Sequence, residues 1–129
     1  MGVKILKRSK GEKLIQSWLE QNDIEFTIEQ TFSWLGQQRC DFYIEKYKTV
    51  IEVDGMQHFK KLKDETDQQF KRRLYLDKHK NEVLTHHLFQ VIRIPYDKLN
   101  IITPKFLINM ITHPRYGKVR DLKNLVSLS

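Results

Sequence analysis

Hydrophobic residues recur at helical spacing near the start of the chain. Four of them share one face of a helix: Leu14, Ile15, Trp18 and Leu19. Such a stripe is typical of a helix that packs on a core. Ser9 followed by Glu12 matches a capping box, so we expect this helix to run from about residue 9 to residue 21.

The next part of the chain alternates between apolar and polar residues, as half-buried strands do. Residues 24–32 and 42–45 alternate in this way, and residues 49–53 are β-branched apart from Glu52. Gly55 ends the last of these segments. Because only short connections separate them, we expect three strands that form an antiparallel meander.

The second half of the chain predicts a helix, a strand and a shorter helix. Apolar residues are sparse in residues 65–87, where the polar face of the predicted helix is strongly basic. The run FQVIRI at residues 89–94 predicts a strand, and residues 104–111 predict a closing helix. The long helix lets the fourth strand return beside the meander by a crossover. The expected fold class is therefore α/β or α+β, a mixed sheet flanked by helices.

Length and composition bound the kind of protein. A chain of 129 residues with 40% hydrophobic residues is long enough for one folded domain with one core. We expect a single domain over residues 1–129, with its core at about residues 9–96 and a basic C-terminal extension at about residues 97–129. The weakly patterned residues 113–129 fit either a last strand or a mobile tail.

Several features favour a cytoplasmic protein. No apolar run approaches the length of a membrane span, and the first residues lack the features of a secretory signal. Cys40 is the only cysteine, which rules out an internal disulfide and a zinc–thiolate cluster. We expect a bacterial or phage-infected host cell as the setting, and no membrane partner.

The chain is strongly basic, with a net charge of +7 from 23 basic and 16 acidic residues. A small basic domain favours a polyanionic partner such as nucleic acid, although the same charge also serves as ordinary solubilising surface. The residues that we expect to contact a DNA backbone are Lys60, Lys61, Lys63, Arg72, Arg73 and Arg93. Arg93, which points away from its neighbours Ile92 and Ile94, also fits a pair with an acid such as Asp77.

Two carboxylates stand among apolar residues on neighbouring strands. A hairpin between these strands brings Asp41 close to Glu52 or Asp54. Like charges held together repel one another unless a cation or a proton lies between them, and oxygen ligands suit a hard ion such as Mg²⁺ or Mn²⁺. The main-chain carbonyl of Val53 offers a third oxygen. The alternative is that Asp41 and Glu52 are ordinary solvent-facing strand acids.

Other polar residues extend the predicted site. Gln57 and His58 would hold water or phosphate, or would simply hydrogen-bond across a turn. Glu12 either serves the first turn of its helix or reaches toward the metal. Phosphodiester hydrolysis needs such oxygen ligands, because a divalent ion activates water and neutralises the charge that builds on the phosphate.

These residues resemble the motifs of the PD-(D/E)xK nuclease superfamily, which has the restriction-endonuclease-like fold. The first-helix glutamate of that family matches Glu12 in SKGEKLI, its motif aspartate matches Asp41 in CDFYI, and its second acid matches Glu52 in IEVDG. The segments IEVDGMQHF, DKHKNEVL and VIRIPYD are similar to small phage and bacterial endonucleases akin to very-short-patch repair and homing endonucleases. The resemblance covers about residues 9–96 and implies a core of helix, three strands, helix and strand. By the same resemblance, the surroundings of the site include Asp77, Lys80 and Arg93.

One position departs from the family pattern. The family carries a lysine two residues after the second acid, and Asp54 stands there in this chain. A lysine would polarise the attacking water, which Asp54 cannot do, although Asp54 could join the metal shell. Gln57, His58 or Lys80 could substitute for the lysine from nearby.

The predicted function is that of an endonuclease that uses Mg²⁺ or Mn²⁺ to hydrolyse phosphodiester bonds in DNA. One alternative is a nucleic-acid-binding protein or accessory subunit without catalysis, in which Asp54 marks a lost activity. Another is a basic structural domain of a phage or mobile element. RNA also fits as a substrate, and cutting both strands would favour a homodimer because one small domain carries one active site.

Overall fold

The computed structural model describes residues 8–56 and 59–126. Its main elements are α1 (Lys10–Gln21), β1 (Thr27–Thr31), β2 (Arg39–Ile44), β3 (Thr49–Asp54), α2 (Asp67–His86), β4 (Gln90–Pro95), α3 (Pro104–Thr112) and β5 (Val119–Asp121). The helices begin where hydroxyl side chains accept a hydrogen bond from a main-chain N–H of the first turn, as the Ser9 hydroxyl does from Glu12. None of the described helices is both long enough and apolar enough to cross a membrane.

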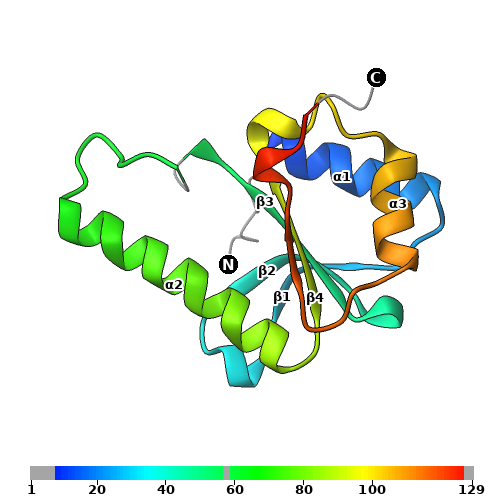
Figure 1. Ribbon diagram of the computed structural model, residues 1–129, viewed down its shortest axis with the longest axis horizontal. Coiled ribbons are helices and arrows are strands. Elements are labelled where there is room, and N and C mark those ends of the chain that lie inside the picture. Colours follow the sequence, from blue (N-terminus) through cyan, green and yellow to red (C-terminus); the bar gives the residue numbers. More distant parts are fainter. Residues whose placement is uncertain (1–7, 57–58, 127–129) are drawn as a thin grey trace, which may run out of the picture.

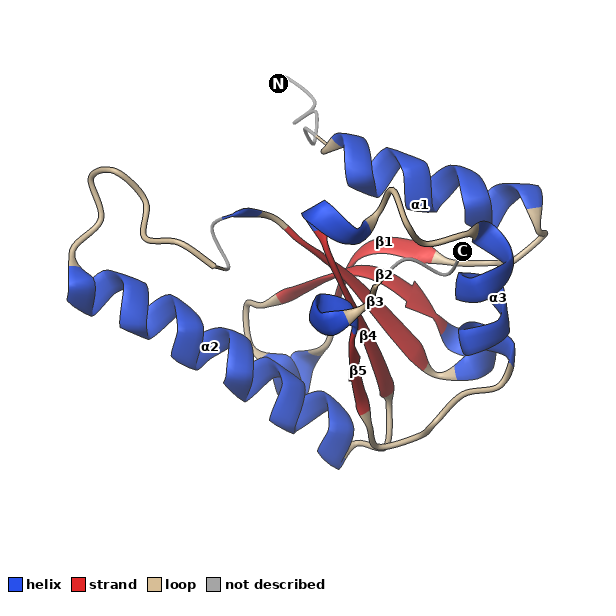
Figure 2. Ribbon diagram, turned by 45° about the horizontal axis from the view of Figure 1, so that its top comes forward, coloured by secondary structure: helices blue, strands red, loops and turns tan. Residues whose placement is uncertain are grey.

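The strands form one mixed sheet in the order β1-β2-β3-β4-β5 (Figure 2). The first three strands are antiparallel, whereas β4 pairs in parallel with both β3 and β5. The long helix α2 makes the crossover between β3 and β4. The predicted meander, crossover and mixed sheet are confirmed, and the open question about the end of the chain is answered by a short last strand.

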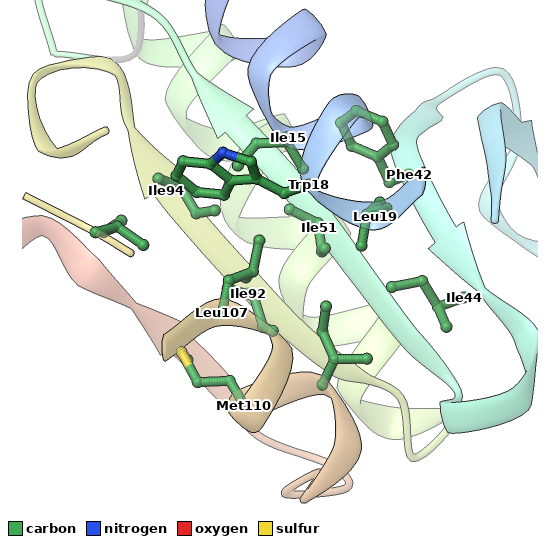
Figure 3. Close-up of a cluster of buried hydrophobic side chains, with 12 residues drawn as sticks. Ile15, Trp18, Leu19, Phe42, Ile44, Ile51, Ile92, Ile94, Leu107 and Met110 are labelled. Atoms are coloured by element: carbon green, nitrogen blue, oxygen red, sulfur yellow. The ribbon is translucent and has the colours of Figure 1, made fainter. Parts of the chain in front are cut away.

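Helices cover both faces of the sheet (Figure 1). The main core lies between the sheet and the pair α1 and α3 (Figure 3). Its fully buried members include Ile15, Leu19, Phe42, Ile44, Ile51, Ile92, Ile94, Leu107 and Ile111. Burying each such side chain stabilises the fold by roughly 1.5–3 kcal/mol. This core holds the strands rigidly in place and so fixes the positions of the polar residues on the opposite face.

The opposite face of the sheet lies under α2 and is partly polar. A smaller apolar cluster covers one end of this face: Leu35, Cys40, Val50, Leu84, Phe89 and Val91. Beyond it, β3 alternates so that Ile51 faces the main core, whereas Glu52 and Asp54 face α2. Both acids are buried, and such burial is costly for carboxylates without partners.

The first half of α2 and the loop before it extend beyond the sheet (Figure 1). The buried residues of α2, Lys80 and Leu84, both belong to its second half. The helix therefore delivers Lys80 to the polar face of the sheet while its first turns lie outside the core.

Candidate active site

Strands β2 and β3 are joined by side chains at the point where their regular pairing ends. The paired residues run from Ile44 with Thr49 to Phe42 with Ile51. At the next position the main-chain N–H of Asp41 donates to Glu52 Oε2 over 2.8 Å, and the N–H of Val53 donates to Asp41 Oδ2 over 2.8 Å. Carboxylate oxygens therefore take the place of main-chain carbonyls, and this holds Asp41 and Glu52 side by side, as the hairpin predicted.

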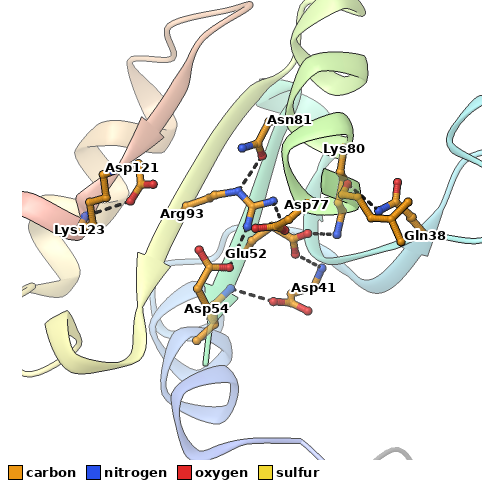
Figure 4. A network of polar contacts seen from close by, with 12 residues as sticks. Gln38, Asp41, Glu52, Asp54, Asp77, Lys80, Asn81, Arg93, Asp121 and Lys123 are labelled. Carbon is orange, nitrogen blue, oxygen red and sulfur yellow. Dashed lines mark hydrogen bonds and ion pairs between the residues drawn. The ribbon is translucent and has the colours of Figure 1, made fainter. Parts of the chain in front are cut away.

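Lys80 reaches these acids from α2 (Figure 4). Its Nζ donates hydrogen bonds to Glu52 Oε1 and to the main-chain carbonyl of Arg39. Lys80 is 7% exposed and Glu52 is 4% exposed. Burial lowers the pKa of Lys80, and the nearby Asp41 carboxylate opposes that shift. The structure thus assembles two acids and one lysine from three separate elements.

A second buried network surrounds Arg93 on β4. Its Nη1 and Nη2 lie 2.8 Å from Asp54 Oδ1 and from Asp77 Oδ1, and its Nε donates to Asn81 Oδ1 over 2.7 Å. At 2% exposed, Arg93 is buried. The structure shows the alternative for Arg93, a pair with acids, and its predicted phosphate contact stays a prediction. Because Asp54 pairs with Arg93, its carboxylate is tolerated in this buried position.

A third acid joins Asp41 and Glu12 at the edge of the site. One carboxylate oxygen from each of Glu12, Glu29 and Asp41 lies within 4.8 Å of the other two. Glu29 comes from β1, where Ile28 pairs with Phe42 and Gln30 pairs with Cys40, so the register sets Glu29 opposite Asp41. We call Glu12, Glu29 and Asp41 the acid cluster. Oxygens bind divalent ions at roughly 2.0–2.6 Å, so opposite ligands of one ion lie about 4–5 Å apart, and the cluster fits a single ion.

The position of Glu12 fits both of the roles that the sequence left open, helix capping and a place beside a metal. Its main-chain N–H donates to the Ser9 hydroxyl, which is the helix-capping role, while its carboxylate belongs to the acid cluster. Burial raises the pKa of Asp41. The Val53 N–H and the positive charges of Lys80, Arg8 and Arg93 oppose this increase. A cation in the cluster would further favour the charged form of Asp41.

The structure leaves the predicted roles of Val53, Gln57 and His58 untested. The main chain of Val53 contributes its N–H to Asp41, and a metal contact by its carbonyl stays a prediction. Gln57 and His58 lie outside the described residues.

The predicted DNA-contacting residues other than Arg93 lie in the loop before α2 and in the first turns of that helix. Lys60, Lys61, Lys63 and Arg72 are exposed. Lys61 pairs with Asp67 over 2.8 Å, and Arg73 Nη2 donates to Glu65 Oε1 over 2.8 Å. These residues therefore place mixed charge on the part of α2 that extends beyond the sheet.

Comparison with known proteins identifies the fold. Neither the protein-family models nor the curated proteins include a match to this chain. Among solved structures, the catalytic domain of the homing endonuclease I-Bth0305I is similar, with a TM-score of 0.59 and 22% sequence identity. The match covers 84% of this chain and 100% of that domain. The chain shares the fold of a homing-endonuclease catalytic domain. The nuclease-like fold predicted from the sequence is thereby confirmed.

Proposed function

We propose that this protein is a metal-dependent endonuclease that hydrolyses phosphodiester bonds in DNA. The observation that carries the proposal is the contact of Lys80 with Glu52 beside Asp41. A half-buried carboxylate, Asp41, stands beside a buried carboxylate and a buried ammonium, Glu52 and Lys80, and phosphodiester hydrolysis by water uses groups of this kind. The similarity in fold to a homing-endonuclease catalytic domain supports the same reaction class.

The carboxylates suit a hard divalent ion such as Mg²⁺ or Mn²⁺. Asp41 would hold it together with Glu12 and Glu29, while the main-chain N–H of Asp41 donates to Glu52. Such an ion supplies an activated water and neutralises charge on the phosphate. Glu52 Oε1 accepts a hydrogen bond from Lys80 and Glu52 Oε2 accepts one from the Asp41 N–H, so Glu52 orients these two groups.

Lys80 would take the role of the lysine of PD-(D/E)xK nucleases. Asp54 occupies the family position on β3, but it pairs with Arg93. Lys80 reaches the second acid from α2 instead. Burial lowers the pKa of Lys80, so Nζ loses a proton more readily than an exposed lysine does. A lysine from α2 would thus replace the lysine that the superfamily carries on the strand, and this supports the finer assignment to that superfamily.

DNA would approach along the basic segment before α2. Lys60, Lys63 and Arg72 are exposed there, and the whole chain carries a net charge of +7. Contacts between such residues and phosphates position a duplex without reading its sequence. Since the chain carries a single site of this kind among its described residues, cutting both strands would require two copies.

Cleavage of supercoiled plasmid by the purified protein tests the proposal. We expect nicked or linear product with Mg²⁺ or Mn²⁺ and none with EDTA, because the acids need a divalent ion to activate water. Linear product at low conversion would indicate a homodimer. Plasmid binding without cleavage under any metal, also on single-stranded and junction substrates, would contradict the proposal and favour the catalytically inactive DNA-binding protein.

A further inference from the structure

Arg8 lies against the acid cluster without a hydrogen bond. Its side chain is 10% exposed, and its Nη1 lies 3.4 Å from Glu12 Oε2 and 3.9 Å from Glu29 Oε1. None of its three guanidinium nitrogens has a hydrogen-bond partner among residues 8–56 and 59–126. Its Cζ lies 4.9 Å from the centroid of the Phe42 ring, a distance typical of a cation–π contact. A largely buried cation thus lies beside Glu12 and Glu29, and its charge also acts on Asp41.

This arrangement differs from the usual pairing of arginine with carboxylates. A guanidinium normally forms short, directional hydrogen bonds, often two in parallel. Arg93 of the same protein does so with two nitrogens, which donate to Asn81 over 2.7 Å and to Asp54 over 2.8 Å, and its Nη2 forms an ion pair with Asp77. Arg8 is held mainly by charge and by the Phe42 ring, which leaves the cluster's oxygens available to a better ligand.

We propose that Arg8 is an internal cation that neutralises the acid cluster in the metal-free protein and is displaced when a divalent ion binds there. The inference rests on the metal site of the proposed function, but it does not depend on cleavage. Arg8 precedes Ser9, the extended N-cap residue, and therefore lies outside α1. The guanidinium can leave the cluster without unwinding the helix.

Displacement of Arg8 sets the apparent affinity for the ion. A ligand that binds only the displaced state has its affinity reduced by the fraction of molecules in that state. If Arg8 occupies the cluster in about nine molecules of ten, removing it tightens apparent metal binding about tenfold. The matched control is Arg115→Gln, which removes the same charge from an exposed side chain.

Mn²⁺ binding to the full chain without DNA tests the inference. The electron paramagnetic resonance signal of free Mn²⁺ gives the dissociation constant for wild type, Arg8→Gln and Arg115→Gln. We expect Arg8→Gln to bind about tenfold more tightly than wild type, and Arg115→Gln to bind as wild type does. Equal or weaker binding by Arg8→Gln, with one ion bound by wild type, would overturn the role of Arg8 and leave the metal site standing. The absence of saturable binding by all three proteins would overturn the metal site and the proposed function together.

Thermal unfolding provides a second measurement on the same proteins. Without metal, Arg8→Gln should unfold at a lower temperature than wild type, because the three carboxylates lose their neighbouring cation. Saturating Mn²⁺ should then raise the unfolding temperature of Arg8→Gln by more than that of wild type. Equal increases in the two proteins would contradict the competition between Arg8 and the ion.

Discussion

We expect Asp41→Ala to lower the rate of plasmid cleavage by about a thousandfold or more. The Asp41 side chain belongs to the acid cluster and accepts a hydrogen bond from the Val53 N–H, so its removal disrupts the metal ligands and one of the two hydrogen bonds of the strand junction. Losses of about this size follow when a group that stabilises charge in a transition state is removed. DNA binding should persist, because the basic segment before α2 is unchanged.

The control for this variant is Asp97→Ala, which removes an exposed aspartate from the turn after β4. It should cleave as wild type does. Asp41→Asn serves as a second variant, because its side-chain oxygen can still accept from the Val53 N–H while the charge is lost. Anisotropy of a labelled duplex measures binding for all of these proteins. Cleavage by Asp41→Ala within a few-fold of the wild-type rate would contradict the assignment.

Lys80→Met should lower cleavage by about a hundredfold to a thousandfold, the range associated with a positioned proton donor or acceptor. Methionine keeps much of the length of the side chain but cannot donate to Glu52 or carry charge. The matched control is Lys78→Met, because Lys78 is an exposed lysine on the same helix. Its cleavage rate should change little, apart from a small effect of the lost charge on DNA binding.

The fold of Lys80→Met needs a separate check, because removing one member of a buried pair is costly. The variant leaves the Glu52 carboxylate buried without its ammonium partner, which destabilises a protein by roughly 3–5 kcal/mol. The double variant Glu52→Gln with Lys80→Met removes both charges and should recover much of that stability. If the double variant is stable and still cleaves at the wild-type rate, Lys80 has no part in catalysis.

Local patterns in the sequence predict most of the fold. The apolar stripe of α1 and the alternation in β2 and β3 each follow from the side of the element that meets the core. The crossover follows from the length of α2, since parallel neighbours need a long connection. The pairing of Asp41 with Glu52 was also predictable, because a tight hairpin allows only a few registers between its two strands.

The remaining site residues depend on contacts between distant elements, which local patterns do not encode. Glu29 meets Asp41 only because of the register between β1 and β2, and nothing in the alternation of β1 sets that register. Arg8 precedes the first helix and has no periodic neighbours to indicate its direction. The sequence did contain a signal for the face of α2 that meets the site. Its residues are spaced three and four apart, as residues on one helical face are: Asp77, Lys80, Asn81 and Leu84.

The sequence allowed two interpretations of Arg93, a contact with phosphate or a pair with an acid. Its flanking isoleucines placed it on the face opposite the main core, which the structure confirms. That face is usually solvated in antiparallel sheets, but here α2 covers it. The guanidinium therefore lies among Asp54, Asp77 and Asn81.

The most direct test of the central claim is to locate Mn²⁺ by anomalous diffraction in crystals of the wild-type protein. We predict an ion within about 2.0–2.6 Å of an Asp41 carboxylate oxygen, with further oxygens from Glu12 and Glu29, and the Arg8 guanidinium moved away from the cluster. Mn²⁺ bound at other acids, with Arg8 still against Glu12 and no ion at Asp41, would contradict the assignment of this cluster as the metal centre of a nuclease.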